Sequence, residues 1–337
     1  MTTSIGGTTG ITYPDASVQN TAATGFGFKN RLINGNMALA QRATSATVTA
    51  GTAVPTASTG YPCVDRFFVY STGANVTAAQ VAGSGAIQYQ LQITGAASVT
   101  AVGVGQRIEQ KNSYDMAGST ATLSVDLANS VLTTVTWTAN YATTADTFGT
   151  IGTPTKTQIA TGTFTVTSTV TNFSAQISIP AAATTGVEIL FTVGAQTSGT
   201  FTVGNVQLEK SATATSFDYR PFGTELALAQ RYFAKFSNDG TGIGGIAVGF
   251  QSSTTAPTFS IKYPQTMRSE PTVSISSLTS SDHITYDTAV TALSTVLMGF
   301  SSGNIFVTTA IAGVQYRPCS LTITNNTSGF LSLASEL

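Results

Sequence analysis

The densest group of side chains able to do chemistry lies late in the chain. Asp282, His283, Tyr286 and Asp287 place two carboxylates, one imidazole and one phenol within six residues. Such groups can transfer protons, and they can also hydrogen-bond a ligand without altering it. Because polar residues are mostly exposed, a solvated loop is the first interpretation and contact with a binding partner is the alternative. Tyr316, which stands beside an arginine, has the same two interpretations.

The remaining acidic residues form no recognisable catalytic arrangement. Hydrolysis of a glycosidic bond needs two carboxylates about 5–10 Å apart, and no pair in this sequence carries a motif that predicts such a spacing. The single histidine, His283, has no recognisable partners for a Ser-His-Asp triad and excludes a histidine-rich zinc site. We therefore expect no enzyme activity, no metal and no cofactor. Glycan cleavage stays a minor alternative, with Asp282 and Asp287 as the first residues to test for it.

Three aromatic residues, Trp137, Tyr141 and Phe148, surround a polar segment in the middle of the chain. An aromatic ring has an apolar face that can cover the C–H surface of a sugar. Trp137 is the only tryptophan, and it alternates with Val135 as a strand residue of the core would. The core is therefore the first interpretation of Trp137, and all three rings are candidate sugar contacts.

The composition indicates a β-rich chain with few charges. Only 9% of the 337 residues are charged, against about 25% in typical proteins, while Val, Ile, Thr, Phe and Tyr recur as they do in strands. The 14 basic residues are scattered singly, so nucleic-acid binding is not expected. No apolar run reaches the roughly 20 residues of a membrane-spanning helix.

In a chain with so few charges, Asp65-Arg66 predicts a buried polar anchor whose two charges contact different partners. Cys63 and Cys319 are interpreted as reduced thiols.

Alternating apolar residues predict strands over much of the chain. Residues 1–25 are too small and polar to form a core and are interpreted as an extended arm. Residues 26–220 read as a jelly-roll-like β-sandwich, because many short alternating runs are separated by Gly, Thr, Asn and Pro turns. In its last strand the alternation changes phase at Gly204-Asn205, where one extra residue in a β-bulge would restore the inward face.

Residues 221–337 predict a smaller β domain that begins with one helix. Thr224 is expected to cap the helix, and Leu226, Ala229, Phe233 and Phe236 follow helical spacing. Strand-like runs follow the helix. The fold class is therefore all-β, with an arm, a sandwich and a smaller β domain with one helix.

Several segments resemble, in order, those of bacteriophage tail-fibre and receptor-binding proteins that contain a carbohydrate-binding-module-like sandwich. The matching segments are GITYPDASVQ at 10–19, NRLINGNMALAQR at 30–42, YPCVDRF at 61–67, residues 135–154, VQLE at 206–209, ELALAQRYF at 225–233, YPQTMRSEPTV at 263–273 and ASEL at 334–337. The likeness spans most of the chain. The chain differs in residues 135–154, where two of the family's loop glycines are replaced.

This resemblance implies a homotrimeric virion protein that binds host cell-surface polysaccharide. Residues 1–25 would attach it to other tail or baseplate proteins, and residues 221–337 would face the host. The chain starts without a secretion signal, so we expect synthesis in the host cytoplasm and assembly into the virion tail or tail tip. A purely structural virion fibre, baseplate or capsid decoration component without glycan binding is the alternative.

Overall fold

The computed structural model describes residues 28–83, 85, 87–238, 240–282 and 287–337, together with three short strands near the start of the chain. These strands, β1 (Ser4–Gly6), β2 (Gly10–Thr12) and β3 (Val18–Gln19), pair antiparallel; the rest of the predicted arm lies outside the described residues. Strands make up most of the regular structure, so the all-β prediction is confirmed. No helix among the described residues is long and apolar enough to cross a membrane.

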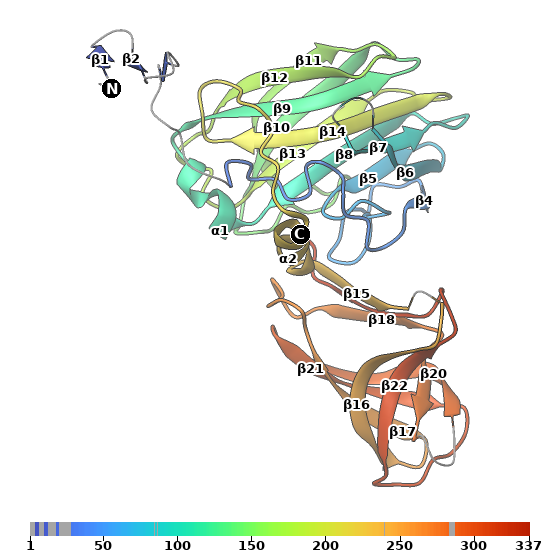
Figure 1. Cartoon of the computed structure of the whole chain (residues 1–337). Helices are drawn as coiled ribbons and strands as arrows, with labels where there is room; N and C mark the ends of the chain where they lie inside the picture. Colours follow the sequence, from blue (N-terminus) through green and yellow to red (C-terminus); the bar gives the residue numbers. More distant parts are fainter. Residues whose placement is uncertain are drawn as a thin grey trace.

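Two antiparallel sheets face each other in the larger part of the molecule (Figure 1). The five-stranded sheet has the order β11 (Lys156–Thr165), β10 (Thr134–Ala142), β13 (Val187–Val193), β8 (Ala101–Ile108) and β5 (Phe68–Thr72). The six-stranded sheet has the order β12 (Thr171–Ser178), β9 (Thr120–Asn129), β14 (Thr200–Glu209), β7 (Tyr89–Thr94), β6 (Val76–Ala82) and β4 (Ser45–Val48). A short helix α1 (Gln110–Ser113) and a 3-10 turn (Tyr114–Met116) follow β8.

Alternate residues of both sheets fill the space between them. Leu123, Val125 and Leu127 of β9 are fully buried in this core. Phe164 of β11 stacks on Phe173 of β12, with 5.1 Å between ring centroids, so aromatic packing joins the two sheets. Burial of one such side chain contributes about 1.5–3 kcal/mol to stability. The strands predicted from alternation in this region are confirmed.

The predicted bulge in β14 is also confirmed. The pairing between β14 and β9 shifts register between Gly204 and Gln207, so Val203 and Val206 both point into the core although they differ in parity. Asn205 has φ of 40°, a left-handed conformation that asparagine adopts more readily than most residues. The bulge thereby leaves Asn205 on the outer side of the sheet.

The helix that follows the sandwich differs from the prediction. Helix α2 covers Phe222–Gln230 and is preceded by Pro221, whose carbonyl oxygen accepts hydrogen bonds from the amides of Thr224 and Glu225. Thr224 therefore does not cap the helix. Phe233 and Phe236 are not helical either: strand β15 (Phe233–Ser237) pairs with β23 (Phe330–Ala334), because this pairing satisfies the backbone of both segments.

The smaller β domain combines a barrel with a three-stranded sheet (Figure 1). The sheet has the order β15, β23 and β18 (Thr272–Ser276). The closed barrel contains β16 (Ile243–Ser253), β17 (Ala256–Lys262), β21 (Ser302–Thr309), β20 (Asp287–Met298), β19 (Thr279–Ser281) and β22 (Pro318–Thr324). In Figure 1 helix α2 and the three-stranded sheet lie between the sandwich and the barrel.

Candidate functional site

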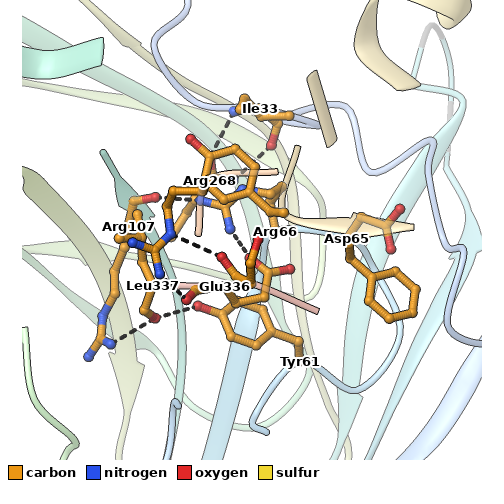
Figure 2. Close-up of polar contacts among 12 residues, drawn as sticks. Ile33, Tyr61, Asp65, Arg66, Arg107, Arg268, Glu336 and Leu337 are labelled. Atoms are coloured by element: carbon orange, nitrogen blue, oxygen red, sulfur yellow. Dashed lines mark hydrogen bonds and ion pairs between the residues drawn. The ribbon is translucent and has the colours of Figure 1, made fainter. Parts of the chain in front are cut away.

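Buried charges connect the sandwich to the end of the chain (Figure 2). The Glu336 carboxylate accepts hydrogen bonds from Arg66 and from Arg42, the latter at 3.1 Å. Arg66 also donates to the carbonyl oxygen of Arg107 at 2.7 Å and is 1% exposed. Burial lowers the pKa of Arg66, and it lowers the pKa of Arg42 to about 10. Arg66 and Glu336 are almost completely buried, so we assign these groups to the domain junction.

Asp65 and Arg66 contact different partners, as predicted. Asp65 accepts a hydrogen bond from the Gln41 side chain at 2.7 Å and lies 3.7 Å from Arg42. Burial raises the pKa of Asp65, and the charge of Arg42 opposes this effect. The two side chains diverge because Arg66 has φ of 70° in the loop before β5, and not because they alternate along a strand.

A third buried cation, Arg107, extends the junction. Arg107 binds Glu188 at 2.9 Å and donates to the carbonyl oxygens of Leu337, at 2.9 Å, and Gly149, at 2.6 Å. The hydroxyl of Tyr61 donates to the same oxygen of Leu337 at 2.9 Å. These hydrogen bonds therefore hold the last residues of the chain against the sandwich. We assign this network to the connection between the domains.

The structure does not bring the three aromatic residues predicted to contact sugar together on one open surface. Trp137 is 7% exposed and stacks on Phe164, so its core interpretation is confirmed and it presents no free ring face. Phe148 is 1% exposed in a cluster that includes Ala229 of helix α2, and its assignment as a sugar contact is corrected for the same reason. Tyr141 is half-buried against the sandwich core.

The late polar cluster is only partly described. His283 and Tyr286 lie outside the described residues, and Asp287 is exposed at the start of β20. Asp282 is 6% exposed and binds Arg317 at 2.8 Å, so its carboxylate is engaged within the domain. Tyr316 is 76% exposed, and its amide donates to the Gln251 carbonyl oxygen at 2.7 Å. Asp287 and Tyr316 are therefore open to a partner, and the structure brings no further predicted site residue beside them within its described part.

The outer surface of the six-stranded sheet carries a group of polar side chains that the sequence did not single out as a site. Core residues alternate with outward residues on each strand, so the amides and hydroxyls of β7, β9, β12 and β14 gather on one side. We call this surface the polar face; it contains Gln90, Gln92, Ser124, Asp126, Asn172, Ser174, Thr202 and Asn205. Residues 211–216 cover the neighbouring end of the sheet, where Ser211 accepts from Thr122 at 2.8 Å.

Asp126 lies at the centre of the polar face. Its two carboxylate oxygens accept hydrogen bonds from the side-chain amides of Asn172 and Asn205, each at 2.8 Å. Asp126 is 7% exposed, whereas Asn172 beside it is exposed and Asn205 is half-buried. A carboxylate can accept about four hydrogen bonds, so Asp126 keeps unused acceptor capacity next to the edge strand β12.

The other buried carboxylates are more completely satisfied. Six of them lie within ion-pairing distance of an arginine or lysine: Asp65, Glu109, Glu188, Glu225, Asp282 and Glu336. Glu209 has no such cation but accepts three hydrogen bonds from Gln207 and Thr215. Asp126 has two donors and no ion pair among the described residues. Among these buried carboxylates, Asp126 therefore has the fewest compensating groups, which makes it the candidate for contact with a ligand.

Unpartnered polar atoms surround Asp126. Gln90 Nε2, Ser124 Oγ and Asn205 Oδ1 are buried and make no hydrogen bond within the described chain. Gln90 and Ser124 are only 4% and 6% exposed, and the Gln90 side chain lies over Gly204, where a Cβ would come within 3.4 Å of Nε2. Each such group calls for water or another hydrogen-bond partner, and Arg42 Nη1 and Arg66 Nε at the domain junction are unpartnered in the same way.

Two sequence signals could have identified this face. Gln88, Gln90 and Gln92 alternate with core residues of β7, and the bulge predicted at Gly204-Asn205 adds an outward asparagine. What the sequence did not show is that Asp126 and Asn205, far apart in the chain, meet across β9 and β14.

No protein-family model matches the chain, and no curated protein matches it. Solved structures resemble part of it. A CBM4 structure is 15% identical over 53% of this chain and 98% of its own, with a TM-score of 0.35. A candidate sugar-binding protein from Bacteroides thetaiotaomicron is 14% identical over 54% and 100%, with a TM-score of 0.37. The enzymatically active domain of tailspike protein 4 of bacteriophage CBA120 is 17% identical over 47% and 21%, with a TM-score of 0.32. All three TM-scores lie below 0.5, so no activity of this chain follows from them.

Proposed function

We propose that this chain is a bacteriophage tail-fibre protein that attaches the virion to host surface glycan through the polar face. The observation that carries the proposal is Asp126, a buried carboxylate with two amide donors and, in the described part of the chain, no paired cation, near unpartnered amide and hydroxyl atoms. The ordered motifs of the sequence, from NRLINGNMALAQR to ASEL, support the assignment to a tail fibre. The protein binds its glycan and does not cleave it.

Sugar hydroxyls suit this set of groups, because each hydroxyl both donates and accepts. One hydroxyl donates to the Asp126 carboxylate, and a neighbouring oxygen accepts from the side-chain amide of Gln90 or Asn172. Hydrogen bonds to a charged group contribute about 1.5–3 kcal/mol each, but water competes for every one of them. Affinity per site is therefore modest, and a homotrimer on a particle that carries several fibres gains attachment strength by avidity.

The rest of the proposal assigns roles to the ends of the chain. The arm of residues 1–25 connects three copies to one another and to other tail or baseplate proteins, and the protein resides in the virion after synthesis in the host cytoplasm. Light scattering measures the mass with and without residues 1–25. A trimer that loses mass on deletion of the arm is the expected result, and a monomer in both cases contradicts the trimer.

Adsorption competition tests the attachment function. Saturating purified protein should block phage adsorption to the host, and a glycan array should identify the bound polysaccharide. Asp126→Ala should weaken glycan binding at least tenfold, because it removes the charged acceptor from the centre of the polar face. The matched control is Thr136→Ala on the outer side of the other sheet, which should bind like the original chain. Unchanged adsorption at saturating protein contradicts the attachment function.

One observation favours a purely structural role as the second candidate. Large apolar residues are exposed on the barrel, including Val248 at 75% and Phe250 at 48%, beside Tyr316. Exposed apolar groups of this kind mark protein contacts, as expected for a fibre or baseplate component without a glycan. This role would be favoured over the first if the protein bound no glycan and if Val248→Ser and Phe250→Ser reduced the mass of the trimer.

A further inference from the structure

The six-stranded sheet contains no basic residue. None of β4, β6, β7, β9, β12 and β14 has a lysine or arginine, while β9 and β14 contribute the carboxylates of Asp126 and Glu209. The five-stranded sheet differs, because it includes Arg107 and Lys156. Lys210, which follows β14, is engaged by Asp115. A carboxylate or sulfate on a ligand would therefore meet Asp126 without a compensating cation on these strands.

The polar face also lacks an aromatic platform. The aromatic residues of these six strands are Tyr89, Phe173 and Phe201, and all three pack in the sandwich core. A ligand that lies over these strands therefore meets amides, hydroxyls and the Asp126 carboxylate, and no ring face that the strands themselves provide; Phe217 and Tyr219 lie beyond the end of β14. Such a surface recognises the hydroxyl edges of a sugar by hydrogen bonds, and it offers little to an apolar sugar face.

From these two observations we infer that the polar face selects neutral, hydroxyl-rich glycans and excludes acidic ones, with Asp126 as the selecting residue. This inference rests on the proposed glycan-binding function and specifies its substrate class. Asp126 accepts from a pair of sugar hydroxyls, and the same carboxylate repels a uronate, a sialate or a sulfate placed beside it, because like charges at a few ångströms in a partly desolvated site oppose binding.

The test compares one polysaccharide in two chemical forms. The neutral polymer that binds best on the array is oxidised at its primary alcohols to uronic acids, which adds charge and leaves the ring hydroxyls in place. Titration calorimetry then measures both forms with the original protein and with Asp126→Asn. The original protein should bind the oxidised form at least tenfold more weakly, and Asp126→Asn should bind the two forms within about twofold of each other. Binding of the neutral form should change little with salt, since no counterion is released.

The possible failures of the two proposals are distinguishable. An array on which no glycan binds overturns the proposed function and the inference together. Acidic polysaccharides as the best ligands of the original protein overturn the inference and leave the glycan-binding function intact. Equal binding of the two polymer forms by the original protein also overturns it. If Asp126→Asn discriminates against the oxidised form as strongly as the original protein, shape and not charge sets the preference, and the role of Asp126 is refuted.

Discussion

Buried carboxylates have different partners at the domain junction and on the polar face. At the junction, Glu336 is bound by Arg66 and Arg42 and is 1% exposed. On the polar face, Asp126 is 7% exposed and has two neutral amide donors. Burial of a charge is unfavourable unless partners compensate it. The junction compensates the Glu336 charge with two guanidinium groups of the chain, whereas on the polar face Asp126 has neutral amide partners and the proposed glycan would add further donors.

This comparison separates the recognisable motifs of the sequence from the residues of the proposed binding surface. The Asp65-Arg66 pair and the ELALAQRYF segment are the most recognisable features of the sequence, and both belong to the connection between sandwich and barrel. The polar face consists of glutamine, asparagine, serine and threonine residues that are common throughout the chain. A set of carboxylate-to-amide substitutions can test whether the two regions really differ.

Glu336→Gln should have the largest effect on stability. The substitution removes the negative charge that compensates two buried guanidinium groups, those of Arg66 and Arg42. Breaking a buried ion pair on one side lowers the free energy of unfolding by about 3–5 kcal/mol. Chemical denaturation measures the difference. The control is Asp115→Asn, because the Arg31–Asp115 pair is partly exposed and its loss should change stability by about 0–1 kcal/mol. A change below 1 kcal/mol for Glu336→Gln would show that the junction does not depend on its charges.

Asp126→Asn makes the same chemical change on the polar face and should lower stability less than Glu336→Gln does. No arginine or lysine among the described residues is paired with Asp126, so its neutralisation orphans no buried cation. We expect the free energy of unfolding to fall by about 1.5–3 kcal/mol, because hydrogen bonds to a charged acceptor are weakened, while binding of a neutral glycan weakens about tenfold for the same reason. A loss of stability as large as that of Glu336→Gln would refute the contrast between the regions.

Glu109, which Arg231 binds at 2.7 Å just after helix α2, should make one pH-dependent contribution to stability. Burial acts to raise the pKa of Glu109, but the hydrogen bonds and charge of Arg231 outweigh it and hold the pKa below its ordinary value of 4.5. A carboxyl whose pKa is lower in the folded state stabilises the protein above its unfolded-state pKa. This contribution is lost as the pH falls through the folded-state pKa. Denaturation at pH values from about 6 to 3 should show the decline, and Glu109→Gln should flatten it.

Local patterns in the sequence predict most of the strands. Where a local pattern indicates the wrong element, pairing with a strand far away in the sequence determines the structure. Alternation along β9 and the phase change at Gly204-Asn205 both correspond to the structure. The three-residue spacing of Phe233 and Phe236 favours a helix, but β23, almost one hundred residues later, pairs with this segment as a strand. The spacing of a few residues carries no information about such a partner.

The candidate site depended even more on distant contacts. The sequence indicated that Gln90 and Gln92 point away from the core, but a glutamine on a strand surface is ordinarily solvated. The absence of a cation beside Asp126 becomes visible only when β12 and β14 are placed on either side of β9. Phe148 was misjudged for the same reason, because its burial depends on residues such as Ala229 from helix α2.

Substitutions of Asn205 have the smallest expected effects, and they separate the contribution of its backbone conformation from that of its side chain. Its φ of 40° is free of strain for glycine, whereas alanine in a left-handed conformation loses about 1–2 kcal/mol. Both Asn205→Gly and Asn205→Ala remove the amide that donates to Asp126. We expect both variants to weaken glycan binding a few-fold, as measured by titration calorimetry, and Asn205→Ala to lower the free energy of unfolding by about 1–2 kcal/mol more than Asn205→Gly does. Equal stability of the two variants would show that the bulge relaxes without a residue suited to positive φ, whereas unchanged binding in both would remove Asn205 from the polar face as a ligand contact.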